Sequence, residues 1–187
     1  MKYRRGFKSD ANSHARDMRS ELGIASHDAL CPWKLAEHLG YVVVKLSEFA
    51  STEPDAVAYL TTGRGQAEFS AVTLPNEGGF WIVYNDSHSP GRQAANLAHE
   101  AAHGLLCHEA APLTDARGSR IFNREQESEA NWLGPALLIS DEAALHIVRQ
   151  SILHAVACQI YGVSLDLLQM RLRVTGSNIR VARQRAA

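Results

Sequence analysis

The stretch of sequence that decides the fold runs from Ser89 to His108 and reads Ser-Pro-Gly-Arg-Gln-Ala-Ala-Asn-Leu-Ala-His-Glu-Ala-Ala-His-Gly-Leu-Leu-Cys-His. A serine before a proline is typical of a helix start, so this pattern predicts a helix from Pro90 to about Cys107 or His108. Within it, His99 and His103 are four residues apart and therefore lie on one face, one turn apart. The other faces carry residues that can be buried: Ala94, Leu97, Ala98, Ala101, Ala102, Leu105 and Leu106.

Two imidazoles at this spacing can bind one zinc ion at about 2.0–2.1 Å. Glu100 follows the first histidine, where its carboxylate can take a proton from a water on the metal. The resulting hydroxide can attack a peptide carbonyl that the ion polarises. The motif and its helical context therefore predict metal-assisted hydrolysis, with His99 and His103 as ligands and Glu100 as general base.

A catalytic zinc ion needs a third protein ligand beside one open position. The longer motif HExxHxxGxxH fails here, because Leu106 replaces its glycine and Glu109 replaces its last histidine. A carboxylate from a later helix is the alternative, and the next helical segment offers three. Glu125 and Glu129 share one face at four-residue spacing, and we expect Glu127 to point elsewhere.

At these residues the chain resembles the ImmA/IrrE-type metallopeptidases. Their motif helix reads approximately R-x-x-x-x-x-A-H-E-x-x-H, as Arg92 to His103 does. A later helix contains E-A-N before an apolar stretch ending in L-L-x-P, and here Glu129-Ala130-Asn131 precedes Leu137-Leu138-Ile139-Ser140. The resemblance covers most of the chain and includes the strand ending at Asn85 and the segments 34–40 and 161–164.

The resemblance implies a zincin-like, gluzincin-like site that holds one Zn²⁺ ion between His99, His103 and Glu129, the glutamate before Ala-Asn being the family's third ligand. It also implies a regulatory endopeptidase whose protein substrate is a helix-turn-helix transcriptional repressor. The chain departs from the family pattern at Gly104, at Gly134-Pro135 and at Ser140, which replaces the usual proline.

The rest of the chain predicts an α+β fold, in which helices flank a small, mostly antiparallel sheet. Before the motif we expect helices over 10–22 and 32–39, and strands over 41–46, 56–61, 69–74 and 79–85, with Gly63-Arg64-Gly65 as a turn. After it we expect helices over 124–134, where Gly134-Pro135 must kink or end the helix, then 141–161 and 165–176. We interpret residues 1–187 as one metallopeptidase domain with a helical C-terminal subregion from about 141.

Composition limits the class of protein. The formal net charge of −1 gives no overall attraction to nucleic acid or acidic lipid, and hydrophobic residues make up an ordinary 45%. Neither a secretory signal nor an apolar run of about 20 residues occurs, and three widely spaced cysteines argue for reduced thiols, so we expect a cytoplasmic protein without membrane contact. We interpret the C-terminal arginines as a solvated basic tail: Arg171, Arg173, Arg180, Arg183 and Arg185.

Two other functions compete with hydrolysis. The segment from Ala155 to Arg173 resembles a helix-turn-helix, which would make the chain a DNA-binding regulator, although its second helix is leucine-rich and suits packing better than base reading. A degenerate peptidase that only binds a partner is the other possibility.

Several residues near the motif keep open roles at this stage. Cys107 could sit near the metal, even as a competing ligand, or be a small buried thiol at the helix end. His108 could cap the helix or line the cleft, and Arg92 could contact substrate or pack the helix. Asn131 could orient a ligand, as could Asp115, Asp141 or Glu142. The donor that stabilises the oxyanion is not identified among Tyr59, Tyr84, His146, His154 and Tyr161.

Overall fold

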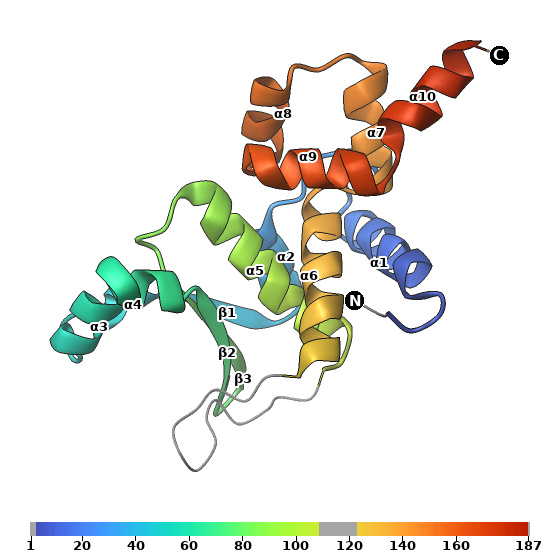
Figure 1. Cartoon of the computed structure of the whole chain (residues 1–187). Coiled ribbons are helices and arrows are strands. Elements are labelled where there is room, and N and C mark those ends of the chain that lie inside the picture. Colours follow the sequence, from blue (N-terminus) through green and yellow to red (C-terminus); the bar gives the residue numbers. More distant parts are fainter. Residues whose placement is uncertain (1–2, 109–122, 187) are drawn as a thin grey trace.

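A three-stranded mixed sheet supports the motif helix in the computed structural model, which describes residues 3–108 and 123–186 (Figure 1). Strand β1 (Tyr41–Lys45) runs parallel to β3 (Gly79–Tyr84), and β3 pairs antiparallel with β2 (Ala71–Asn76), in the order β1-β3-β2. The register aligns Val43, Ile82 and Thr73 across the three strands, so their side chains share one face.

Helix α5 (Pro90–Leu105) covers that face of the sheet, where Leu97 packs with Ile82 and Tyr84. Helix α6 (Arg124–Leu138) lies beside α5, α1 (Phe7–Glu21) lies beside α6, and α2 (Pro32–His38) packs on α5 (Figure 1). The opposite face of the sheet is covered near Val83 by the 3₁₀ turn η1 (Leu46–Phe49) and α3 (Pro54–Thr61), which leads into α4 (Gly63–Glu68).

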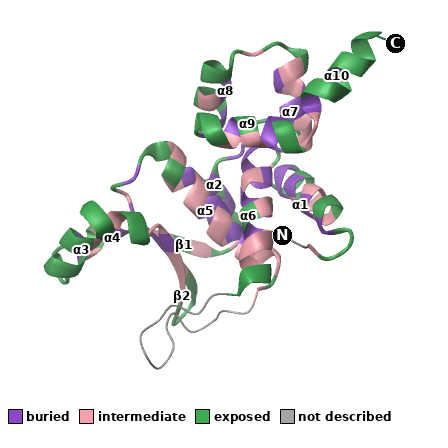
Figure 2. Ribbon diagram, in the orientation of Figure 1, coloured by how far each residue is buried: buried purple, intermediate pink, exposed green. Residues whose placement is uncertain are grey.

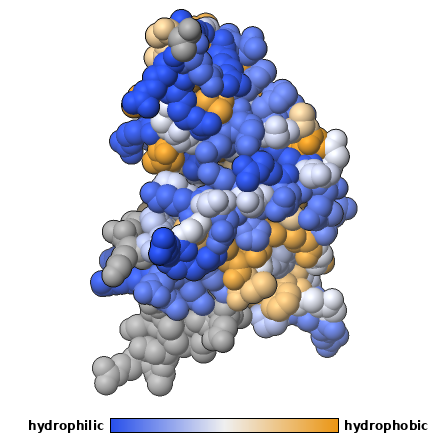
Figure 3. Space-filling view, turned by 90° about the vertical axis from the view of Figure 1, so that its right-hand side faces the viewer, coloured by the Kyte–Doolittle hydropathy of each residue, from blue (hydrophilic) through white to orange (hydrophobic). Residues whose placement is uncertain are grey.

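The C-terminal part consists of α7 (Asp141–Arg149), α8 (His154–Tyr161), α9 (Leu165–Val174) and α10 (Ser177–Ala186). Its apolar core continues from the end of α6, with Leu138, Ile139, Ile147 and Leu168 buried together, and Figure 2 shows buried segments along α6, α7 and α9. Mostly hydrophilic side chains cover this end in the view of Figure 3.

The α+β class is confirmed, and so are the helix and strand locations nearest the motif. The predicted strand 56–61 and the predicted turn at Gly63-Arg64-Gly65 are wrong, because α3 and α4 occupy them. Pro54 stands at the first turn of α3, and within α3 only Val57 is buried. A short segment with one buried apolar residue carries little periodicity by which to separate strand from helix.

Two helix boundaries after the motif also differ from expectation. Helix α6 does not end at Gly134 but continues through Pro135 to Leu138. The single helix predicted over 141–161 is wrong: it is divided at Ser151, whose φ of 53° lies in the left-handed region, into α7 and α8.

We expected all five arginines of the C-terminal segment to face solvent, and one of them does not. Arg173, Arg180, Arg183 and Arg185 are exposed, but Arg171 is only 1% exposed and the expectation is wrong for it. Among the described residues, none of the helices combines the length and the apolar character that a membrane-spanning segment requires.

Candidate metal centre

Three side chains from α5 and α6 converge on one point. Nε2 of His103 lies 3.1 Å from Nε2 of His99. Oε2 of Glu127 lies 3.4 Å from the His99 nitrogen, and its Oε1 lies 3.6 Å from the His103 nitrogen. Among the described residues these three form the one group whose ligand atoms could hold a metal ion.

The spacing of these ligand atoms fits a tetrahedral metal ion. Ligands at about 2.0–2.1 Å from zinc, at tetrahedral angles, lie about 3.3–3.4 Å from one another. The two imidazole nitrogens lie 3.1 Å apart, and each lies 3.4–3.6 Å from one oxygen of the Glu127 carboxylate, which is close to that value. The side chains remain 22–29% exposed, so solvent or a substrate can reach the remaining side of the group.

The protonation state of His103 also suits a ligand. Burial and the neighbouring His99 lower its pKa from 6.5 to about 4, although Glu127 acts in the opposite direction. The imidazole is therefore neutral at ordinary pH, which is the form that binds metal ions.

The packing of α6 on α5 explains why Glu127 reaches the histidines. A Cβ on Gly134 would lie 3.1 Å from both Cα and N of His99, a tight contact with backbone atoms, so glycine favours this close approach of the two helices. Glu127 precedes Gly134 by seven residues, which is nearly two full turns, and so lies on the same face of α6. Glu129 precedes Gly134 by five residues and so lies about 140° from Gly134 around the helix axis.

Of the predicted site residues, the structure brings together His99 and His103 but does not bring Glu129 to them. The Glu129 carboxylate lies 3.2 Å from Nε2 of His108 and 3.6 Å from Nε of Arg4. Glu127, which we expected to point elsewhere, takes the place beside the imidazoles. Its heptad spacing from Gly134 was the sequence signal that could have identified it.

Glu100 lies between α5 and the sheet, where Thr73 of β2 donates a hydrogen bond of 2.6 Å to its Oε2. Tyr41 of β1 faces the same helix, and its hydroxyl occupies the space that a Cβ on Gly104 would need. Burial and the nearby Glu100 carboxylate raise the pKa of Tyr41, which keeps it a hydrogen-bond donor. Gly104, at which the chain departs from the family pattern, therefore leaves the space that the Tyr41 hydroxyl occupies.

The other candidates lie elsewhere. Tyr84 is buried beneath α5, Tyr161 donates to the His27 carbonyl, His146 stacks on His27, and Tyr59 is exposed beside Glu68. Arg92 donates to Ser70 and therefore contacts the residue next to β2. Cys107 and Asn131 are exposed, Asp141 binds Arg171, Glu142 lies near Arg16, and Glu109 and Asp115 lie outside the described residues.

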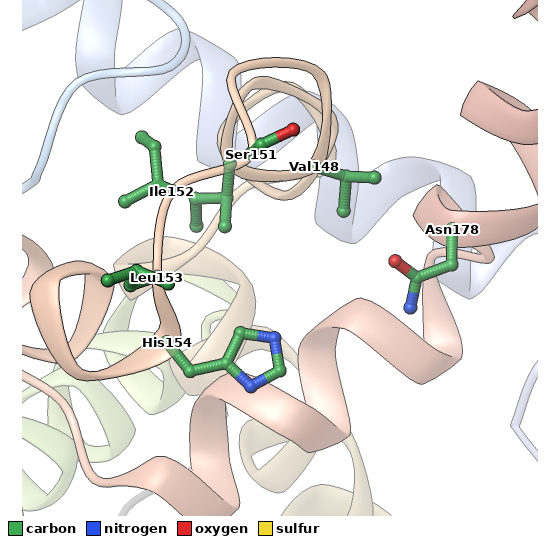
Figure 4. Close-up of a pocket in the computed structure, with 7 residues that line it drawn as sticks. Val148, Ser151, Ile152, Leu153, His154 and Asn178 are labelled. Carbon is green, nitrogen blue, oxygen red and sulfur yellow. The ribbon is translucent and has the colours of Figure 1, made fainter.

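A pocket of about 340 Å³ lies near the C-terminal helices and not at the metal group. Figure 4 shows it between the α7–α8 connection and Asn178 of α10, with His154 at its edge. Its lining is mainly apolar and includes His154, one of the oxyanion candidates, but none of His99, His103 and Glu127. It does not take part in the candidate centre.

Comparison with known proteins agrees with the geometry. The model of the peptidase M78 family, described as an IrrE N-terminal-like domain, matches residues 64–173, which include α5 and α6. A search of curated proteins finds no match.

Proposed function

The chain belongs to the IrrE N-terminal-like family of M78 metallopeptidases, and from that premise we propose that it is a zinc-dependent endopeptidase with His99, His103 and Glu127 as the metal ligands. The convergence of these three side chains, with ligand atoms close enough to share one ion, is the observation that carries the proposal. Two imidazoles and one carboxylate are the donor set of many catalytic zinc sites.

A zinc ion held by His99, His103 and Glu127 would act as a Lewis acid, polarising a carbonyl and making water a stronger acid. Glu100 then serves as general base. Because Thr73 fixes Oε2, the other oxygen is left to take a proton from the attacking water and to deliver it to the leaving amine. Tyr41, held against Gly104 close to Glu100, is the candidate donor to the oxyanion.

The sheet edge beside Glu100 offers a place for a peptide. Within the described residues, β2 pairs with β3 along one side only, and Thr73 belongs to it. An extended peptide that adds to this edge would lie along the strand that contacts the general base. A protein or peptide substrate follows from the family, and a helix-turn-helix repressor as that substrate is proposed from the resemblance alone.

The proposal is tested by metal content and cleavage together. Glu100→Gln should retain stoichiometric zinc and lose cleavage of a casein or repressor substrate by at least about 10³-fold, because the amide cannot accept the proton. Glu127→Ala should lose both. Cleavage by Glu100→Gln at the wild-type rate would remove the mechanism, and full zinc content in Glu127→Ala would remove the ligand assignment.

The DNA-binding alternative has weaker support. Helices α8 and α9 are joined by a short connection that begins at Gly162, whose φ is 62°. The first turn of α9, which would meet base edges, exposes Leu165 and the acidic Asp166, a poor match to a polyanion. Retention on duplex DNA that weakens steeply with added salt would favour this alternative.

A further inference from the structure

A line of hydrogen-bonding side chains leads from His103 away from the metal group. Nδ1 of His103 lies 2.9 Å from Nδ1 of His108. Nε2 of His108 lies 3.2 Å from a carboxylate oxygen of Glu129, whose other oxygen lies 3.6 Å from Arg4. The line therefore joins α5, His108 three residues beyond its end, α6 and the N-terminal segment.

The direction of each hydrogen bond follows from chemistry. If Nε2 of His103 faces the ion, the proton of the neutral ring resides on Nδ1, which must donate. His108 then accepts at Nδ1 and carries its own proton on Nε2, which donates to the Glu129 carboxylate. A carboxylate only accepts, so it fixes the direction of both bonds from the far end.

We propose that His108 and Glu129 are positioning residues that hold His103 in the tautomer and ring orientation that present Nε2 to zinc. The inference rests on the proposed function, since it assigns a role around the same ion. It also gives Glu129 a place different from the one predicted from sequence: it acts on the metal through two imidazoles and not as a ligand.

The turn that follows α5 places His108 beside His103. Cys107 has a φ of 51°, a left-handed conformation usually left to glycine, and the amide of His108 bonds back to the carbonyl of His103. This turn brings the His108 ring against the His103 ring, at a centroid distance of 4.9 Å. The His108 side chain is only 7% exposed, so both ring nitrogens depend on protein partners.

The test measures zinc affinity by competition with a chromophoric chelator. His108→Ala and Glu129→Gln should each weaken zinc binding by about 10–100-fold, the usual cost of removing a partner that orients a histidine ligand. His108→Asn keeps an acceptor near the Nδ1 position but cannot reach Glu129, so its loss should be smaller than that of His108→Ala. Glu125→Gln, an exposed acid on the same helix, is the matched control and should bind as wild type does.

Nitrogen-15 spectra of the histidine rings in the zinc-loaded protein provide a second readout. We expect a metal-bound Nε2 and a protonated Nδ1 for His103, with the reverse protonation, Nε2–H, for His108. Circular dichroism of each variant confirms folding, and Glu129→Gln, which preserves shape, keeps the test valid if His108→Ala does not fold.

The outcomes separate the two proposals. Wild-type protein without stoichiometric zinc overturns the proposed function and the positioning role with it. Wild type that binds zinc, while His108→Ala and Glu129→Gln match Glu125→Gln, overturns the positioning role alone. Loss of zinc in Glu129→Ala as complete as in Glu127→Ala would make Glu129 a ligand and also end the inference.

Discussion

At the scale of single residues, His103 couples the site to pH. Its pKa is lowered to about 4 by burial first and by His99 next, whereas the unfolded chain titrates near 6.5. Above pH 6.5 His103 is neutral in both the folded and the unfolded state, so its ionisation does not change the free energy of unfolding. As the pH falls from 6.5 toward 4, His103 is protonated in the unfolded chain but stays neutral in the folded protein, so the folded state loses stability.

Metal-free wild type should therefore be destabilised by about 2 kcal/mol at pH 5 through this residue, since one pKa unit is worth about 1.4 kcal/mol. The measurement is urea unfolding in chelator at pH 7.5, 6 and 5. His103→Gln serves as the reference that lacks the group and should show a flatter dependence. Parallel curves for the two proteins would contradict the assignment.

Residue identity in the site was predictable from sequence to different degrees. The four-residue spacing predicted that His99 and His103 share a face, because a helix fixes which residues do so, and their ring nitrogens lie 3.1 Å apart. Which carboxylate lies beside that pair did not follow from sequence, since the rotation of α6 against α5 decides whether Glu127 or Glu129 faces it. That rotation is set by Gly134, a residue that sequence reasoning treated as a helix interruption.

At the scale of elements, the contact between α5 and α6 sets the site geometry. Gly134→Ala would place a methyl group 3.1 Å from the backbone of His99. The helices must then move apart, which we expect to cost about 1–2 kcal/mol of stability even after alanine's better helix propensity, and to weaken zinc binding about 10-fold. Urea unfolding and chelator competition measure both effects, with the exposed Asn131→Ala as control. A more stable Gly134→Ala with unchanged zinc affinity would refute this role.

The secondary structure was predicted wrongly for segments in which tertiary contacts, and not local sequence pattern, determine whether a helix or a strand forms. Helix α3 was taken for a strand because 56–61 contains apolar and aromatic residues, yet Tyr59 is 56% exposed and packs little. Strand β2, by contrast, was recognisable because turn residues separate it from β3. Local pattern thus located the hairpin and the motif helix, whereas the short helices beside the sheet carried too weak a pattern.

At the scale of the whole molecule, two buried arginines join the parts of the fold at the C-terminal end of α6. Arg19 of α1 donates to the Leu138 carbonyl, and Arg171 of α9 donates to the Ile139 carbonyl and to Asp141. Cations at the last carbonyls of a helix interact favourably with its dipole. Burial lowers the pKa of each arginine to about 10, so both remain charged at neutral pH.

Arg171→Met should accordingly destabilise the protein by about 3 kcal/mol, because it leaves the Asp141 carboxylate and a helix-end carbonyl without their buried partner. Zinc affinity of the folded variant should match wild type, since Glu127 precedes Ile139 by twelve residues, roughly 18 Å along α6. Arg173→Met, on the exposed side of α9, is the control for losing a charge from that helix. Equal urea midpoints for the two variants would show that Arg171 does not join the C-terminal helices to α6. A selective loss of zinc affinity in Arg171→Met would show that the far end of α6 governs its metal-binding end.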